Sequence, residues 1–85
     1  MDLKNKNILL TGGSSGIGKK TAEILAEKGA KVLITGRSYD KIETVKQQLG
    51  LLGVSFDIAD VENIAAKTEE CLSLLGGRVD VLINN

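Results

Sequence analysis

Four glycines within seven residues are the feature of this sequence best suited to chemistry. The segment reads Thr11-Gly12-Gly13-Ser14-Ser15-Gly16-Ile17-Gly18, follows a short apolar run and leads directly into a stretch with helical periodicity. Unpaired amides and the positive end of a helix dipole favour an anion at such a junction, and residues without a Cβ let the backbone approach a pyrophosphate. We predict that this glycine loop, residues 11–18, binds the phosphates of a dinucleotide.

The residues of the glycine loop have different predicted roles. Gly12 makes the turn, Gly16 allows the close approach to the pyrophosphate, and Gly18 lets the helix lie close to the neighbouring strand. A strand-to-helix turn without a ligand is the alternative, but such a turn needs one glycine or two. The side-chain hydroxyls available to the phosphate or to the backbone belong to Thr11, Ser14 and Ser15.

A nucleoside-triphosphate loop is a second, less favoured interpretation of the same segment. Residues 13–19 match the first seven positions of the pattern G-x-x-x-x-G-K-[ST]. The eighth position holds Lys20, whose charge would repel the magnesium ion that a hydroxyl normally coordinates there. Thr21 comes one residue late, which rotates it by about 100° around the helix. Lys19 and Lys20 also oppose the helix dipole unless an anion is bound nearby.

Strands and helices alternate along the chain in the order β-α-β-α-β-α-β. Nearly continuous apolar runs predict buried parallel strands at Ile8–Leu10, Val32–Ile34, Leu51–Phe56 and Val79–Ile83. Helical periodicity predicts helices from Ile17 to Lys28, from the N-cap Ser38 to Leu49, and from Asp60 to Leu75. The handedness of parallel crossovers then favours an α/β fold with a Rossmann-like, doubly wound parallel sheet.

Ligands of such sheets bind beyond the carboxyl ends of the strands, where the strand order reverses. We therefore expect the loops that begin at Thr11, Thr35, Asp57 and Asn84 to share one edge of the sheet. On the first helix, the apolar face is expected to carry Ile17, Thr21, Ile24 and Leu25, with Gly29 as the stop. On the third, we expect Cys71 to be a small buried side chain without a redox role.

Composition excludes several classes of function. Histidine is absent and cysteine occurs once, so intrachain disulfides, Cys/His zinc sites and nucleophile–histidine pairs are excluded. The 11 basic residues balance the 11 acidic ones, and we expect no nucleic-acid partner. The apolar runs are far shorter than the roughly 20 residues that span a bilayer, and residues 1–6 are unlike a signal peptide. We expect a cytoplasmic protein without a membrane or metal partner.

Three motifs together resemble the short-chain dehydrogenase/reductase family. Thr11, Gly12, Gly16 and Gly18 match its glycine motif T-G-x-x-x-G-x-G. The resemblance places Asp57 at the adenine and implies that Ile58 lines the adenine pocket. Asn84 and Asn85 begin a third family motif, Asn-Asn-Ala-Gly. The resemblance implies that residues 1–85 are the N-terminal part of an NAD(P)-binding domain.

The resemblance also implies hydride transfer between a nicotinamide cofactor and a small alcohol or carbonyl substrate. Family members use a downstream Tyr-x-x-x-Lys pair; here Tyr39 is followed at that spacing by Glu43, so no catalytic residue is expected within residues 1–85. The resemblance implies a homo-oligomer when the protein is complete. A non-catalytic nucleotide-binding module, or an inactive truncated fragment, is the alternative.

The residues after the second strand favour NADP over NAD. Dinucleotide sites choose between the two cofactors about 20 residues beyond the glycine loop, where a carboxylate binds the ribose 2′-hydroxyl or a cation meets a 2′-phosphate. Here Gly36 supplies no carboxylate, and the guanidinium of Arg37 can bind a phosphate through two hydrogen bonds. Ser38 can add a hydroxyl, although we expect it first to cap the following helix.

Overall fold

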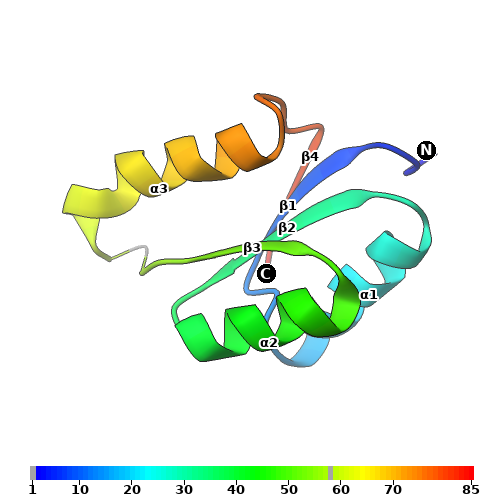
Figure 1. Cartoon of the computed structure of the whole chain (residues 1–85), viewed down its shortest axis with the longest axis horizontal. Coiled ribbons are helices and arrows are strands. Elements are labelled where there is room, and N and C mark those ends of the chain that lie inside the picture. Colours follow the sequence, from blue (N-terminus) through cyan, green and yellow to red (C-terminus); the bar gives the residue numbers. More distant parts are fainter. Residues whose placement is uncertain (1, 58) are drawn as a thin grey trace.

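The computed structural model describes residues 2–57 and 59–85, which form a parallel sheet with helices on both faces (Figure 1). The strands are β1 (Asn7–Thr11), β2 (Lys31–Gly36), β3 (Leu52–Ser55) and β4 (Val81–Asn84). The helices are α1 (Gly16–Glu27), α2 (Tyr39–Leu49) and α3 (Val61–Leu74). This confirms the predicted element order and fold class. The last strand begins two residues later than predicted, at Val81 rather than Val79.

The sheet has the strand order β3-β2-β1-β4, and each neighbouring pair is parallel. Leu10 of β1 lies opposite Ile34 of β2 on one side and Ile83 of β4 on the other. The chain therefore moves outward from β1 to β3 and then returns to the far side of β1. The strand order reverses between β1 and β4, which is where sheets of this type bind ligands.

Side chains alternate between two apolar layers along the strands. Helices α1 and α2 cover one face of the sheet and α3 covers the other (Figure 1). Ile8 and Leu10 of β1 belong to the layer under α1 and α2. Leu33 of β2 points to the opposite layer, where it packs with Cys71 and Leu75 at the end of α3. Burial of Cys71, as predicted, raises the pKa of its thiol, and the nearby Glu70 carboxylate adds to the increase.

The prediction of which residues of α1 are buried is wrong in part. Its buried residues are Gly18, Ala22 and Leu25, whereas Ile17 and Ile24 are 79% and 42% exposed. Small residues at this spacing let the helix axis lie close to the sheet, and the larger isoleucines are consequently turned outward. In the described residues, no helix is both long and apolar enough to cross a membrane.

The helix ends follow the predicted signals. Gly29 and Gly50 adopt left-handed backbone conformations, with φ of +87° and +67°, directly after α1 and α2. The Ser38 hydroxyl accepts a hydrogen bond from the Lys41 amide at 3.4 Å, which caps α2 as expected. Asp60 precedes α3 as predicted, but its carboxylate accepts from the Asn63 side chain at 2.7 Å rather than from a backbone amide.

A buried amide ties the amino end of the sheet to α3. The Asn7 side chain is 8% exposed and donates hydrogen bonds to the carbonyls of Leu75 (2.7 Å) and Arg78 (3.0 Å). The Asn7 backbone amide donates to the Asp80 carboxylate at 2.7 Å. These bonds connect β1 to the segment between α3 and β4, so they determine where β4 enters the sheet.

Replacing Asn7 by alanine should lower the free energy of unfolding by about 1–3 kcal/mol, because two carbonyls lose their buried donor. Urea denaturation measures the change. The control is Asn63→Ala, which removes an exposed bond within α3 and should cost less than about 0.5 kcal/mol. Equal losses in the two variants would contradict the role given to Asn7.

The stability of the protein should also depend on Asp80 at acid pH. Hydrogen bonding from the Asn7 amide, with a further contribution from Arg78, lowers the pKa of Asp80. A lowered folded-state pKa stabilises the fold above the ordinary carboxyl pKa of about 3.9, and this contribution disappears as the pH falls through the folded-state value. We expect the stability difference between wild type and Asp80→Asn to narrow in denaturant unfolding from about pH 7 to about pH 3. A constant difference would show that the charge does not contribute.

Candidate functional site

A cleft of about 350 Å³ opens at the carboxyl ends of β1, β2 and β4. It occupies the sheet edge at which the strand order reverses. Of the four loops predicted to share this edge, those that begin at Thr11, Thr35 and Asn84 line the cleft, as expected. The lining residues are Thr11, Gly12, Ser14, Ser15, Thr35, Gly36, Arg37, Phe56, Asn84 and Asn85.

The glycine loop folds over the end of β2. The amides of Gly12 and Gly13 both donate to the Thr35 carbonyl, at 2.9 and 3.4 Å. Gly12 adopts a φ of +70°, as expected of the residue that makes the turn. A Cβ on Gly13 would collide with the side chain of Ile34, which is fully buried. The loop therefore needs glycine at position 12 for its conformation and at position 13 for space.

The start of α1 has free backbone donors directly after Ser15, which lines the cleft. Ser15 is the N-cap residue, but its side chain makes no capping hydrogen bond, and the first turn contains no acidic residue. The first amides of a helix have no partner within the helix, and they carry its positive partial charge. Gly16 has a φ of +58°, and no atom lies within 4 Å of the place where its Cβ would be. This open backbone fits the bridging phosphates of a dinucleotide.

Gly18 makes a closer contact than we predicted, and with a different partner. A Cβ at this position would collide with the Gly12 carbonyl oxygen and would lie 2.7 Å from the Asn85 side-chain nitrogen. The close approach is therefore between the helix and its own glycine loop, rather than between the helix and a neighbouring strand. Because the Gly12 carbonyl is a backbone group, a side chain at position 18 would require the glycine loop itself to shift.

Hydrogen bonds join the glycine loop to the end of β4. The Thr11 hydroxyl donates to the Asn84 side-chain oxygen at 2.8 Å and accepts from the Asn85 amide at 3.1 Å. The Asn85 side chain donates to the Gly12 carbonyl at 3.3 Å. The two asparagines therefore hold the β1 end of the loop, while β2 holds it from the other side.

The residues after β2 occupy the remaining wall of the cleft. Arg37 lines the cleft together with Ser14 and Ser15, the two residues that lead into α1. The Ser38 hydroxyl already accepts the hydrogen bond that caps α2. The structure therefore brings Arg37, but not the Ser38 hydroxyl, to the candidate phosphate site.

Five of the predicted residues are not part of the cleft lining, namely Gly16, Ile17, Gly18, Ser38 and Asp57, and a sixth falls outside the described residues. Ile17 is in the first turn of α1 with an exposed side chain. Asp57 is exposed, and its carboxylate accepts from the Ala59 amide at 2.9 Å. Ile58 lies outside the described residues. Phe56, which the sequence did not single out, lines the cleft instead; its place at the end of an apolar run was the available signal.

The structure disfavours a nucleoside-triphosphate loop at residues 13–20. The Thr21 hydroxyl donates to the Ile17 carbonyl one turn back, at 2.8 Å, so it is engaged within the helix. The Lys20 ammonium forms an ion pair with Glu23 at 3.8 Å. Within residues 2–57 and 59–85, no group of three His, Cys, Asp or Glu side chains is arranged to hold a metal ion.

The family model for short chain dehydrogenases matches residues 6–85. The chain belongs to this family. An uncharacterized oxidoreductase of Staphylococcus saprophyticus is 39% identical over 90 residues, which cover 99% of this chain and 35% of that protein.

Two solved structures of the family are similar to the whole fold. The 3-ketoacyl-(acyl-carrier-protein) reductase of Brucella melitensis, complexed with NADH, is 38% identical with a TM-score of 0.85, over 94% of this chain and 34% of that one. An actinorhodin polyketide ketoreductase with NADPH is 30% identical with a TM-score of 0.86, over 95% of this chain and 33% of that one. The chain thus spans about a third of the length of these relatives.

Thr11→Val should lower the free energy of unfolding by about 1 kcal/mol, because the Asn84 side chain and the Asn85 amide lose their common partner. The matched control is Thr21→Val, which removes a hydroxyl bonded only within α1 and should change stability by less than about 0.5 kcal/mol. Thermal unfolding of both variants measures the difference. A Thr21→Val loss as large as that of Thr11→Val would contradict the bridging role.

Proposed function

We propose that the cleft binds a nicotinamide dinucleotide, NADP in preference to NAD. The observation that carries this proposal is the meeting of the glycine loop, through Gly12, Ser14 and Ser15 just before α1, with Arg37 at one cleft. Membership of the short chain dehydrogenase family supports it, as do the NADH and NADPH complexes of similar structures. The nicotinamide group, when bound, supplies the hydride chemistry.

Each wall of the cleft would bind a different part of the dinucleotide. The amides at residues 14–18, with the Ser14 and Ser15 hydroxyls, would hold the pyrophosphate at the positive end of α1. Thr11, Asn84 and Asn85 keep this loop in position from the β4 side. We assign the adenine to the side of the cleft that Phe56 lines, with Asp57 following it in the chain.

The preference for NADP rests on charge at the end of β2. Gly36 offers no carboxylate that would repel a phosphate or accept from a ribose hydroxyl. Arg37 lines the cleft and can bind a 2′-phosphate with two parallel, charge-assisted hydrogen bonds. A guanidinium so placed discriminates against NAD, which lacks the phosphate. Ser38 contributes by holding the start of α2 through its cap.

The full-length protein would act as an oxidoreductase on a small alcohol or carbonyl compound. Residues 1–85 would be the N-terminal part of the NAD(P)-binding domain, with the substrate groups and proton donor supplied by residues outside it. The two similar solved structures are named as reductases of ketoacyl and polyketide substrates, which favours a ketone. We further propose a homo-oligomer located in the cytoplasm.

Replacing Arg37 by alanine in the full-length protein should weaken NADPH binding by about 10- to 100-fold and leave NADH binding nearly unchanged. Fluorescence titration with each cofactor measures this. Arg78→Ala is the control, because Arg78 pairs with Asp80 at the opposite edge of the sheet. Equal weakening of both cofactors would refute the phosphate role of Arg37. Saturable binding of magnesium ATP, with no binding of either dinucleotide, would refute the proposed function.

A further inference from the structure

Gly36, the last residue of β2, is a glycine that the backbone conformation does not require. It pairs in register with Ser55 of β3 as an ordinary strand residue, and it is not among the glycines that adopt a positive φ. The backbone at this position would therefore accept any L-residue, including the acidic residue that binds a ribose 2′-hydroxyl. Because Gly36 lines the cleft directly before Arg37, the reason for its missing side chain bears on the choice of cofactor.

Lack of room, rather than conformation, keeps a side chain away from position 36. A Cβ there would lie 3.2 Å from Ile42 Cδ1 and 3.7 Å from Ile42 Cγ1. The Ser14 hydroxyl oxygen would be 3.3 Å away. Carbon atoms in good contact are separated by about 3.5–4.0 Å, so even the first carbon of a side chain would be crowded. Ile42 supplies two of the three nearest atoms.

Ile42 has little freedom to move away from position 36. It is the fourth residue of α2 and is 1% exposed, and its amide donates to the Ser38 carbonyl at 3.0 Å. Its other branch, Cγ2, lies 2.8 Å from the place where Gly53 of β3 would carry a Cβ. The isoleucine thus fills the space left by two glycines on neighbouring strands. In a closely packed core, Cδ1 cannot shift without displacing other side chains.

We infer that Ile42 is a specificity-determining residue of the dinucleotide site, because its Cδ1 methyl group excludes a carboxylate from position 36 and leaves the choice of cofactor to Arg37. The inference rests on the proposed function and adds to it a core residue that does not itself line the cleft. An aspartate introduced at position 36 would be pushed aside by Ile42, so it could not reach the ribose 2′-hydroxyl.

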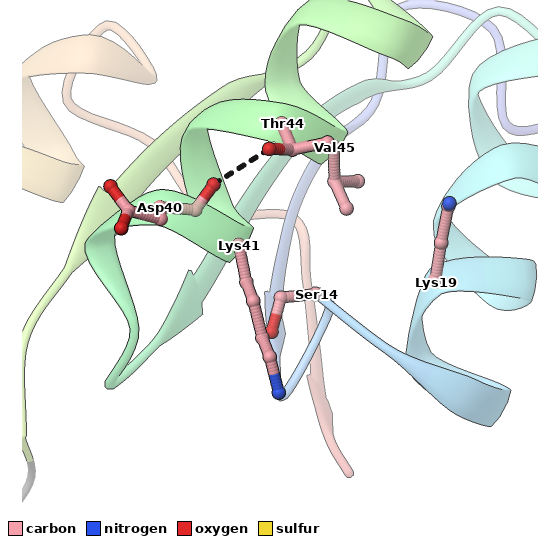
Figure 2. Close-up of a pocket in the computed structure, with 6 residues that line it drawn as sticks. All are labelled: Ser14, Lys19, Asp40, Lys41, Thr44 and Val45. Atoms are coloured by element: carbon pink, nitrogen blue, oxygen red, sulfur yellow. Dashed lines mark hydrogen bonds between the residues drawn. The ribbon is translucent and has the colours of Figure 1, made fainter.

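The test uses three variants of the full-length protein: Gly36→Asp, Ile42→Val and the two combined. Valine lacks Cδ1 but keeps the β-branch, so it clears the space beside position 36 and preserves the contact with Gly53. The matched control combines Gly36→Asp with Val45→Ala. Val45 is also a buried residue of α2, but it lines a different cavity, of about 210 Å³, between α2 and α1 (Figure 2). Fluorescence titrations measure the affinity of each variant for NADH and NADPH.

Gly36→Asp alone should weaken NADPH binding by charge repulsion and should not improve NADH binding, because Ile42 holds the carboxylate out of reach. Adding Ile42→Val should then strengthen NADH binding about tenfold, the gain from one hydrogen bond to a charged group, without restoring NADPH binding. The control should behave like Gly36→Asp. The inference is wrong if Ile42→Val adds nothing, if the control gains as much, or if the affinities for both cofactors rise together.

A second measurement needs no cofactor. Gly36→Ala adds one carbon at the crowded position, and urea unfolding compares its effect in the wild type and in the Ile42→Val background. Comparing the two backgrounds cancels the effect of losing a glycine on the unfolded chain. We expect Gly36→Ala to lower the urea midpoint more in the wild type than beside Val at position 42.

The two measurements separate the inference from the function on which it rests. Equal urea shifts in the two backgrounds, in a protein that binds the dinucleotides, would overturn only the role given to Ile42. Failure of the wild type to bind either dinucleotide would contradict the proposed function, and the cofactor role of Ile42 with it.

Discussion

The candidate site depends on the hydrogen bonds and close contacts of the Gly12 peptide groups. The Gly12 amide is bound to the Thr35 carbonyl at the end of β2, and its carbonyl accepts from Asn85 after β4. The same carbonyl faces Gly18 so closely that any side chain there would collide with it. Three elements thus meet on one residue. Because each contact uses backbone or a short side chain, the loop has little freedom, and the amides at the start of α1 keep their direction toward the cleft.

The sheet topology explains why these contacts exist at all. Strand β1 lies between β2 and β4, so the loop that follows it is flanked by the carboxyl ends of both of these strands. Hydrogen bonds from Asn7 to the segment after α3 determine where β4 enters the sheet at the other edge. Interactions at the amino edge therefore help to position Asn84 beside Thr11 at the carboxyl edge, about 13 Å away along β1.

The same topology brings two helix starts together around Ser14. Helices α1 and α2 lie on one face of the sheet (Figure 1), and both begin at its carboxyl edge. Their positive ends are close enough for Lys19 and Lys41 to line one cavity.

Much of the fold and part of the site could be predicted from local sequence. Apolar runs locate the strands because both faces of a parallel sheet are buried, and Gly29 and Gly50 mark helix ends because they adopt left-handed conformations. The glycine loop could be recognised because its spacing places backbone amides at a helix start. The outward turn of Ile17 could not be predicted, because helical periodicity alone does not say which of two adjacent faces the small residues Gly18 and Ala22 bring to the sheet.

By itself the sequence determined the order of elements, the family and the position of the glycine loop at residues 11–18, since these depend on neighbours along the chain. Tertiary structure alone decided that Gly18 meets Gly12, that Phe56 rather than Asp57 lines the cleft, and that Lys19 and Lys41 share a cavity. The physical reason is that such contacts depend on how close the helices lie to the sheet and to each other. That distance is determined by side chains from several separate segments at once.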